Sequence, residues 1–224
     1  MKRQIIKTKD GSNTIHLPEW NENYHSHHGA IQEAMHVFID AGLNYLKSKD
    51  KKSISVLEVG FGTGLNAVLS LDFALKNELL VRYTGIEAYP ISESEYQLLK
   101  YEEQYNQLGI NSKYQMIFDA QWEKTVQIDD NYSLTKKEVS IHGCQLHDES
   151  FDCVFFDAFG PRVQPEMWTK EVFEFLHKAL KKGGVLVTYC AKGDVRRTLI
   201  SVGFEVEKLP GPPGKREMLR AVKN

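Results

Sequence analysis

The stretch VLEVGFGTGLN, Val56–Asn66, decides the fold because it joins a strand pattern to a helix pattern through a glycine-rich turn. Apolar residues flank Glu58, and Gly60, Gly62 and Gly64 follow in the spacing G-x-G-x-G. Open α/β sheets bind ligands at such a turn, outside the carboxyl ends of the strands. Dinucleotide-binding proteins use the longer spacing G-x-G-x-x-G. The stretch therefore predicts a tight turn that holds a nucleotide-like ligand, although a tight turn alone would need the same glycines.

The pattern around this turn alternates between strands and helices, which predicts an α/β fold with a doubly wound, mostly parallel sheet. We expect strands at 54–59, 80–88, 113–118, 151–159, 184–190, 204–209 and 216–222. We expect helices at 65–77, 92–108, 165–181 and 193–202, the third of them ended by Gly183 and Gly184. The last two strands are joined by the short loop PGPPGK and should be antiparallel neighbours. The expected sheet is thus Rossmann-like and seven-stranded, with a C-terminal antiparallel hairpin.

The chain divides into an N-terminal extension, residues 1–52, and a core domain, residues 53–224. The extension should hold a hairpin that turns at Asp10-Gly11, because Asp-Gly is a frequent hairpin turn. A helix should follow, because apolar residues recur at intervals of three and four from Ile31 to Leu46. The stretch 126–146 alternates like a strand pair, and we interpret it as a hairpin inserted before the fourth parallel strand.

Composition indicates a globular protein of a reducing compartment. The sequence has no apolar run of the length of about 18 residues that a membrane span needs. Its N-terminus is not of the secretion-signal type. Cys144, Cys153 and Cys190 form neither a disulfide framework nor a zinc pattern. We therefore expect a cytoplasmic protein without a membrane partner.

Charge is distributed unevenly along the chain. Residues 178–224 hold 11 Lys and Arg against 4 Asp and Glu, a balance of +7, whereas residues 1–177 hold 17 against 26, a balance of −9. A basic section of this kind is either a solvated face or a surface that binds a polyanion.

Acidic residues at strand ends favour S-adenosylmethionine (SAM) over a dinucleotide as the ligand. Glu87 ends the second expected strand, where a carboxylate can accept the hydroxyls of a ribose. Asp119 ends the third expected strand, where it can accept the exocyclic amine of adenine. SAM has no pyrophosphate, and its cationic groups suit a turn that carries Glu58. Phe61, Thr63 and Asn66 complete the expected cofactor-binding turn.

Asp157 ends the fourth expected strand, which in this layout faces the group to be transferred. A carboxylate there can orient an amine acceptor and help to remove its proton. The simpler interpretation is a strand-end Asp that caps the next turn. We therefore expect Asp157 to be catalytic and to lie against the cofactor.

The motifs EVGFGTGLN, FFDAFGPRVQPEMWT, TYCAKGDVRRTL and GPPGKREML, with HSHHGAIQEAMHVFI upstream, together resemble those of MnmC-type tRNA methyltransferases. The resemblance covers residues 24–221 and implies a class I SAM-dependent methyltransferase fold. It implies N-methylation of 5-aminomethyl-2-thiouridine at the tRNA wobble position. It also implies that Gly60, Gly62, Gly64 and Glu87 hold SAM and that Asp157 is the active-site acid. Two-domain members continue into a flavin-dependent oxidase, so a chain ending at Asn224 resembles the stand-alone form, with a separate oxidase as a possible partner.

The expected tRNA partner, through its anticodon stem-loop, needs a cationic surface near the cofactor. Two loops should open on the same edge of the sheet as the glycine turn, and they supply candidate phosphate contacts at Lys192, Arg196, Arg197, Lys215 and Arg216. Tyr24 and Phe159 are candidates for packing around the base.

Three histidines, His25, His27 and His28, lack a spacing that completes a metal site, so we expect no metal. The alternative functions are a small-molecule amine methyltransferase, an aminopropyltransferase, an NAD dehydrogenase and a non-catalytic nucleotide-binding module.

Overall fold

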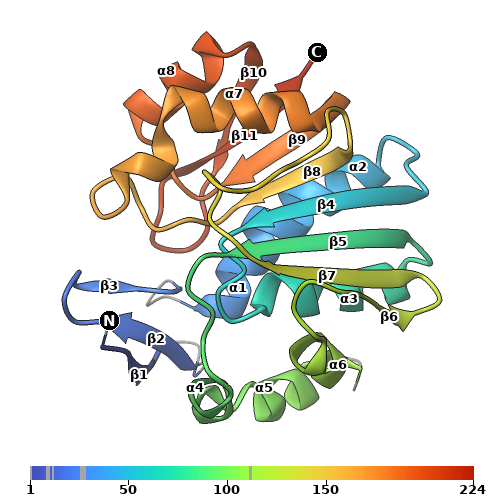
Figure 1. The fold of residues 1–224 in the computed structure, drawn as a ribbon, viewed down its shortest axis with the longest axis vertical. Coiled ribbons are helices and arrows are strands. Elements are labelled where there is room, and N and C mark those ends of the chain that lie inside the picture. Colours follow the sequence, from blue (N-terminus) through green and yellow to red (C-terminus); the bar gives the residue numbers. More distant parts are fainter. Residues whose placement is uncertain (1, 9–10, 12, 26–28, 111–112) are drawn as a thin grey trace.

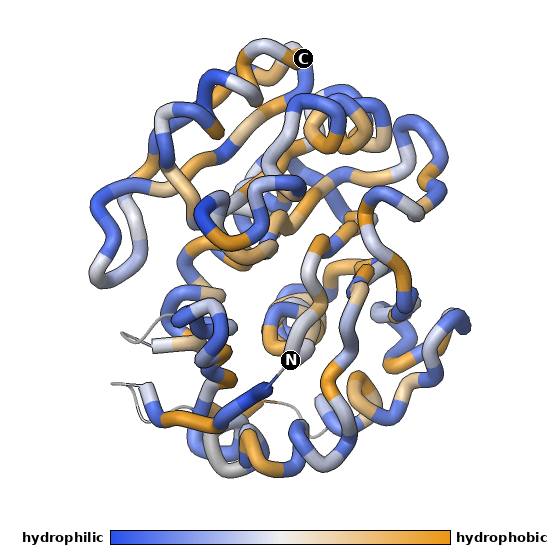
Figure 2. The backbone as a smooth tube through the Cα atoms, turned by 60° about the vertical axis from the view of Figure 1, so that its left-hand side comes forward, coloured by the Kyte–Doolittle hydropathy of each residue, from blue (hydrophilic) through white to orange (hydrophobic). Residues whose placement is uncertain are grey.

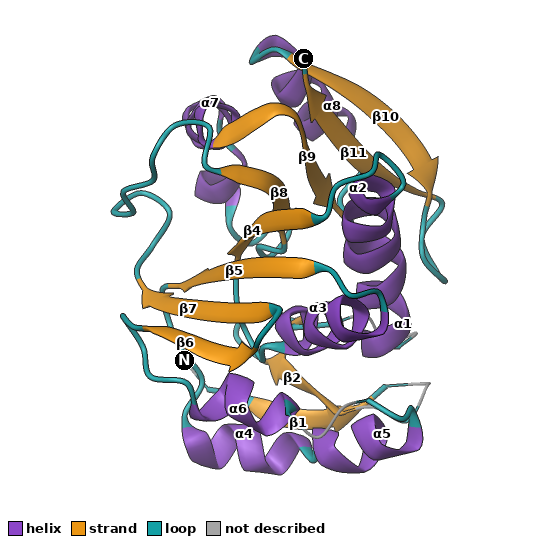
Figure 3. Cartoon of the chain, turned by 90° about the vertical axis from the view of Figure 1, so that its right-hand side faces the viewer, coloured by secondary structure: helices purple, strands orange, loops and turns teal. Residues whose placement is uncertain are grey.

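A computed structural model describes residues 2–8, 11, 13–25, 29–110 and 113–224. Within these residues, eight strands form one large mixed sheet and three form a small sheet beside it (Figure 1). Helices cover both faces of the large sheet (Figure 3). The described part of the chain contains no helix that is long and apolar enough to cross a membrane.

The large sheet follows the order β10-β11-β9-β8-β4-β5-β7-β6. Its strands are β4 (Ser53–Val59), β5 (Leu80–Glu87), β6 (Thr125–Asp129), β7 (Tyr132–Glu138), β8 (Phe151–Phe156), β9 (Leu180–Thr188), β10 (Phe204–Pro210) and β11 (Glu217–Lys223). β9, β8, β4, β5 and β7 pair in parallel. β11 is antiparallel to both β9 and β10, so β10 runs parallel to the central strands. The mostly parallel sheet with its C-terminal antiparallel hairpin is therefore confirmed, but it has eight strands and not the seven expected, because β6 adds an antiparallel edge strand beside β7.

The helical segments are α1 (Ala30–Ala34), the π-helix η1 (Met35–Asn44), α2 (Tyr45–Lys47), α3 (Leu65–Lys76), α4 (Glu93–Leu99), α5 (Tyr101–Gln107), α6 (Tyr114–Asp119), the 3-10 helix η2 (Pro165–Trp168), α7 (Lys170–Ala179) and α8 (Gly193–Ser201). The first three run on as one helical stretch, as the apolar spacing from Ile31 to Leu46 predicts.

The central strands are buried on both faces, and consecutive residues of each strand pack into different apolar clusters on the two sides of the sheet. Val56 and Phe155 pack in the larger apolar cluster, on the side of η1 and α3. Leu57 and Phe156 pack in the second cluster, with residues of α7 and α8. This two-sided cover explains the unbroken apolar runs in the sequence. In Figure 2 the hydrophobic colour accordingly runs along the inner strands, whereas many outer loops are hydrophilic.

The third parallel strand is β7, and the prediction that residues 113–118 form it is wrong. Residues 114–119 form helix α6, which buries Tyr114 and Ile117 on one side. Asp119 therefore ends a helix and not a strand. The strand pair expected within 126–146 is present as β6 and β7, but it is part of the sheet and not an insertion.

Two predicted helices are shorter than expected. The helix expected at 92–108 is split at Lys100, which adopts a left-handed conformation with φ 51° between α4 and α5. The helix expected at 165–181 is a 3-10 turn followed by α7, whose first turn is capped by the Thr169 hydroxyl. It ends at Ala179 because Leu180 already adopts the extended backbone of β9, so Gly183 and Gly184 lie inside that strand.

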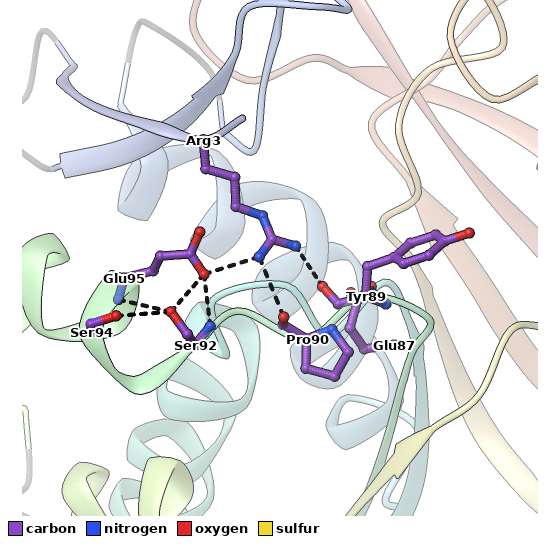
Figure 4. Close-up of polar contacts among 7 residues, drawn as sticks. All are labelled: Arg3, Glu87, Tyr89, Pro90, Ser92, Ser94 and Glu95. Carbon is purple, nitrogen blue, oxygen red and sulfur yellow. Dashed lines mark hydrogen bonds and ion pairs between the residues drawn. The ribbon is translucent and has the colours of Figure 1, made fainter. Parts of the chain in front are cut away.

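The N-terminal hairpin is confirmed as β1 (Gln4–Lys7) paired with β2 (Asn13–Leu17), and β3 (Glu22–Asn23) adds a third strand. Asp10 of the expected turn lies outside the described residues. Figure 4 shows how Arg3 fastens this sheet to the connection after β5. Its guanidinium donates to the carbonyl oxygens of Tyr89 at 2.7 Å and Pro90 at 3.3 Å and pairs with Glu95 at 3.0 Å. The small sheet is thereby held beside the strand ends of the large one.

Candidate active site

A cavity of about 580 Å³ lies at the carboxyl ends of the central strands. This volume falls within the range of about 300–1,000 Å³ that small-molecule sites occupy. Its walls come from the small sheet, α1, the turn after β4, the segments after β5, β7, β8 and β9, and the loop between β10 and β11. Elements from both ends of the sequence therefore enclose the strand ends, as the fold rule for open α/β sheets predicts.

The glycine turn follows β4 and forms part of the cavity wall. Gly60 has φ 90°, and a Cβ atom there would lie 2.7 Å from the backbone oxygen of Asp157. Gly64 has φ 74° and opens helix α3. The amides of Gly60 and Phe61 both donate to the carbonyl of Ile86, at 3.1 and 3.0 Å. Only glycine allows the backbone to pass this close to two neighbouring strands.

Glu87, at the end of β5, organises the approach to the turn. One carboxylate oxygen accepts the Gly62 amide at 3.0 Å, and the other accepts the Tyr89 amide at 2.9 Å. A carboxylate has about four acceptor positions, so each oxygen keeps capacity for a further donor. Glu87 is thus fixed in orientation and lines the cavity, where a ligand hydroxyl can reach it.

Asn66 joins two carboxyl groups at the base of the cavity. Its side-chain nitrogen donates to Glu58 at 2.7 Å and to Asp157 at 2.8 Å. Glu58 is fully buried, and this burial, with the nearby charge of Asp157, raises the pKa of Glu58 well above its ordinary value. Burial therefore disfavours the charged form of Glu58, and Asn66 links this carboxyl group to that of Asp157.

Asp157 is a carboxyl group of the cavity wall whose pKa is raised to about 7. Enclosure by the surrounding residues is the largest cause, and the charge of the Glu33 carboxylate acts in the same direction. The hydrogen bond from Asn66 and the Lys215 ammonium act in the opposite direction. A carboxyl group whose pKa lies near the working pH can both accept and release a proton during a reaction.

An aromatic wall lies beside the turn, where a Cβ atom on Gly62 would come within 3.3 Å of the Tyr24 ring. Tyr24 and Trp20 each meet Phe159 edge to face, with ring centroids 5.2 and 5.6 Å apart. Phe159 is held in place because Trp168 donates its indole N–H to the Phe159 carbonyl at 2.7 Å. Burial raises the pKa of Tyr24 to about 12, so its hydroxyl stays neutral. The two residues expected to pack around a base therefore share one wall of the cavity.

The five expected cationic contacts separate into two groups. Lys192 and Lys215 line the cavity, whereas Arg196, Arg197 and Arg216 are not among its described lining residues. Arg216 is exposed, and Arg197 is exposed but paired with Asp194 on its own helix. Lys215 points inward and pairs with Glu33 of α1, so it is not displayed to an outside phosphate as expected.

Asp119 lies away from the site, contrary to its expected place beside an adenine. Among the described residues, it contributes to a second cavity of about 670 Å³, lined by residues of α4, α5 and α6, and not to the first. The residues that follow the true third strand are Val139, Ser140 and Ile141, and they line the first cavity. The strand-end rule would have found them had β7 been recognised.

The histidine-rich segment is described only in part. His27 and His28 lie outside the described residues. The imidazole of His25 lies 3.0 Å from the Thr14 hydroxyl and 3.4 Å from the Thr63 hydroxyl, so it connects the small sheet to the glycine turn. The described residues contain no group of three or more His, Cys, Asp or Glu that is placed to hold a metal ion.

Known proteins resemble this chain over most of its length. The tRNA 5-methylaminomethyl-2-thiouridine biosynthesis bifunctional protein MnmC of Leptospira interrogans is 29% identical over 214 residues, which cover 90% of this chain and 32% of that protein. The MnmC protein of Delftia acidovorans is 27% identical over 238 residues, covering 99% of this chain and 35% of that protein. The chain thus spans about a third of the length of these relatives.

The fold is also shared with a solved structure. The crystal structure of MNMC2 from Aquifex aeolicus superposes with a TM-score of 0.74 at 24% sequence identity, covering 99% of this chain and 70% of that one. A family model described as S-adenosyl-L-methionine-dependent methyltransferase matches residues 103–224, which is more than half of the chain. The strand-end cavity, with its glycine turn and fixed carboxylate, lies where that cofactor is expected. The chain belongs to the family of S-adenosyl-L-methionine-dependent methyltransferases.

Proposed function

We propose that this protein transfers a methyl group from SAM to the exocyclic amine of 5-aminomethyl-2-thiouridine at the wobble position of tRNA. The observation that carries the proposal is that Asp157 lines the same cavity as the glycine turn and the aromatic residues Tyr24 and Phe159. A carboxyl group in that cavity can serve both a cofactor on the turn and a base against the aromatic wall. The MnmC relatives, named for the biosynthesis of 5-methylaminomethyl-2-thiouridine in tRNA, support the same substrate.

The residues of the cavity fit SAM. A Cβ atom at Gly60 would collide with the Asp157 backbone, so glycine there lets the turn pack against the end of β8, and the turn residues line the cavity where a ligand can reach them. Glu87 lines the cavity, where its carboxylate can accept ribose hydroxyls, and the segment from Val139 to Ile141 lines the same cavity and can pack against the adenine. We assign cofactor binding to Gly60, Phe61, Gly62, Thr63, Gly64, Asn66, Glu87 and Asp157. We leave out Asp119 and also Glu58, which is fully buried behind Asn66 and is not among the described residues that line the cavity.

The chemistry needed from the protein is orientation and proton removal. When bound, SAM supplies a methyl group on a sulfonium, which departs as a neutral thioether. The acceptor is an alkylamine with a pKa of about 10, so it enters the site as an ammonium at neutral pH. Asp157 accepts its proton, Asn66 keeps the carboxylate aligned, and the freed nitrogen lone pair forms the new N–C bond as the S–C bond breaks.

The aromatic wall favours a nucleoside over a small polyamine as the acceptor. Phe159 and Tyr24 offer ring faces and edges against which an unstacked base packs. A small-molecule amine methyltransferase or an aminopropyltransferase would need the carboxylates but not this wall. The exposed cations Lys192, which lines the cavity, and Arg216, which follows Lys215 in the chain, then contact the phosphates of the anticodon stem-loop.

Two finer assignments belong to the same proposal. The aminomethyl intermediate comes from a separate reaction, for which an oxidase acting on the wobble uridine is the candidate partner. The protein works in the cytoplasm, where tRNA is modified. Its three cysteines are unpaired in this structure, and Cys153 and Cys190 are buried.

The test is direct methyl transfer. Purified protein, labelled SAM and tRNA that carries 5-aminomethyl-2-thiouridine should give 5-methylaminomethyl-2-thiouridine, identified by nucleoside mass spectrometry. The same tRNA with an unmodified 2-thiouridine is the control and should stay unlabelled. Labelling of both substrates, or of neither, would contradict the assignment.

A further inference from the structure

Lys215 occupies a cation-binding pocket built by other parts of the chain. Its ammonium pairs with the Glu33 carboxylate of α1 and lies 3.9 Å from the centroid of the Tyr189 ring. The side chain of Glu33 is only 11% exposed and that of Lys215 is 33% exposed. An ammonium between a carboxylate and an aromatic face is bound by charge and by the ring quadrupole.

The Tyr189 ring and the backbone of Glu33 are each held by contacts that do not involve Lys215. The hydroxyl of Tyr189 donates to the Ala158 carbonyl at 2.9 Å, which sets the orientation of the ring. The Glu33 amide donates to the Gly29 carbonyl at 3.2 Å within the first turn of the helix. Carboxylate and ring therefore come from two elements that also pack against the core, whereas Lys215 comes from a surface loop.

The pocket is continuous with the proposed reaction site. Glu33, Tyr189, Lys215 and Asp157 all line the same cavity. The charges of Glu33 and Lys215 both act on Asp157. A cation held between Glu33 and Tyr189 is thus also a neighbour of the proposed proton acceptor.

We propose that Glu33, the face of Tyr189 and Asp157 form the subsite for the acceptor's primary ammonium group, and that Lys215 is an internal occupant which the substrate must displace. The inference rests on the proposed function. A lysine side chain and an aminomethyl group both end in –CH₂–NH₃⁺, so one replaces the other in the same contacts. The loop of residues 211–216 then acts as a plug that holds the subsite ready in the absence of substrate.

The first experiment removes the plug. Binding of ethylammonium chloride is measured by NMR titration at constant ionic strength, with sodium chloride as the matched salt, for wild type, Lys215→Met and Lys215→Arg. We expect Lys215→Met to bind ethylammonium at least tenfold more tightly than wild type, and Lys215→Arg, which keeps a cation, to resemble wild type. Adding Glu33→Gln to Lys215→Met should abolish the gain. Equal affinity of Lys215→Met and wild type would overturn the proposal.

The second experiment needs only the wild-type chain and decides the question even if Lys215→Met does not fold. Acetylation of lysines by acetic anhydride is followed by peptide mass spectrometry, with and without saturating ethylammonium. Because ethylamine also consumes the reagent, the labelling rate of Lys215 is expressed relative to those of Lys51 and Lys181, which pair with Asp152 at 2.9 and 2.8 Å and serve as internal references. Displacement should raise this relative rate at least threefold. An unchanged relative rate at Lys215 would count against displacement.

The third experiment separates this inference from the proposed function. With free 5-aminomethyl-2-thiouridine, which has no phosphate, Lys215→Met should lower KM at least threefold and Glu33→Gln should raise it at least tenfold. A Lys215 that contacts phosphate would leave this KM unchanged, which would refute the plug. If neither the nucleoside nor the tRNA is methylated, the proposed function fails, and ethylammonium binding still tests the subsite.

Discussion

Two cavities of similar size share the glycine turn but differ in chemistry. Phe61, Gly62 and Thr63 line both the cavity of about 580 Å³ and the cavity of about 670 Å³. The first contains a carboxyl group whose pKa is raised toward 7 and which faces the open space. The second contains Lys136, a buried cation that is already engaged with protein groups. Cavity volume alone therefore does not identify the reaction site.

The cation of the second cavity has a structural explanation. Lys136 donates to the Phe118 carbonyl at 2.9 Å, and its ammonium lies 5.1 Å from the Trp122 ring and 5.9 Å from the Phe61 ring. Burial lowers the pKa of Lys136 to about 8, although the charge of Asp119 opposes the shift. Lys136 thus packs against the turn from the second cavity, whereas Asp157 lines the first cavity, where we propose that the ligand binds. We therefore expect substitutions in the first cavity to affect activity more than substitutions in the second.

The largest effect is expected for Asp157→Asn. The amide keeps the size and the hydrogen bond to Asn66 but cannot accept a proton, and loss of a general base typically costs a factor of about 10²–10⁴. We expect kcat to fall at least a hundredfold while SAM affinity, measured by calorimetry, changes less than threefold. Full activity of this variant would remove Asp157 from the mechanism.

A smaller effect, on cofactor binding, is expected for Glu87→Ala. The substitution removes an acceptor for ribose hydroxyls and frees the amides of Gly62 and Tyr89. Hydrogen bonds to a charged group contribute about 1.5–3 kcal/mol, which corresponds to a loss of roughly 10–100-fold in SAM affinity. Calorimetry with SAM measures it, and Glu93→Ala, on the side of the second cavity, is the matched control. Equal losses for the two variants would erase the distinction between the cavities.

The pH dependence of the rate tests the environment of Asp157. Because its pKa is about 7, the carboxyl group gains its charge as pH rises through 7. We expect kcat/KM to rise about tenfold between pH 6 and pH 8, as one ionisation with that midpoint requires. Glu33→Gln removes a negative charge that raises this pKa, so its profile should shift to lower pH. A flat profile in the wild type would contradict a titrating base.

The smallest effect is expected for Asp119→Asn. Asp119 lines only the second cavity among the described residues, and it is exposed at the end of α6. SAM affinity and kcat should both stay within twofold of wild type, as measured in the same assays. A loss comparable to that of Glu87→Ala would restore Asp119 to the cofactor site.

The sequence predicts the fold correctly where a pattern fits only one kind of element. The nearly unbroken apolar runs of β4, β8 and β9 predict parallel strands buried on both faces, and the glycines after Val59 predict the turn that follows β4. The run KYQMIF misled because a short apolar run fits a helix as well as a strand. The sequence of β7 does not predict a core strand, because only alternate residues, Tyr132, Leu134 and Lys136, are buried. Such alternation is typical of a half-exposed hairpin strand.

The inward position of Lys215 was beyond sequence reasoning for a different reason. Its place in the loop PGPPGK predicts exposure on the edge of the sheet, and Arg216 beside it is indeed exposed. Only the fold brings Glu33, from a helix 182 positions earlier, to the same point. A charge pair that joins distant elements leaves no local periodicity, so its presence cannot be inferred from spacing.

The contacts of Arg3 connect two parts of the cavity wall that are far apart in the sequence: the small N-terminal sheet and the segment after β5. Arg3 contacts Tyr89, Pro90 and Glu95, and Glu87 lies just before them (Figure 4). We expect a ligand that binds Glu87 to restrain the small sheet as well, because Glu87 is linked to Arg3 through hydrogen bonds to the amide and the carbonyl of Tyr89. Slowed amide hydrogen exchange in β1 would then report that a ligand has entered, although no atom of that strand's backbone needs to touch it.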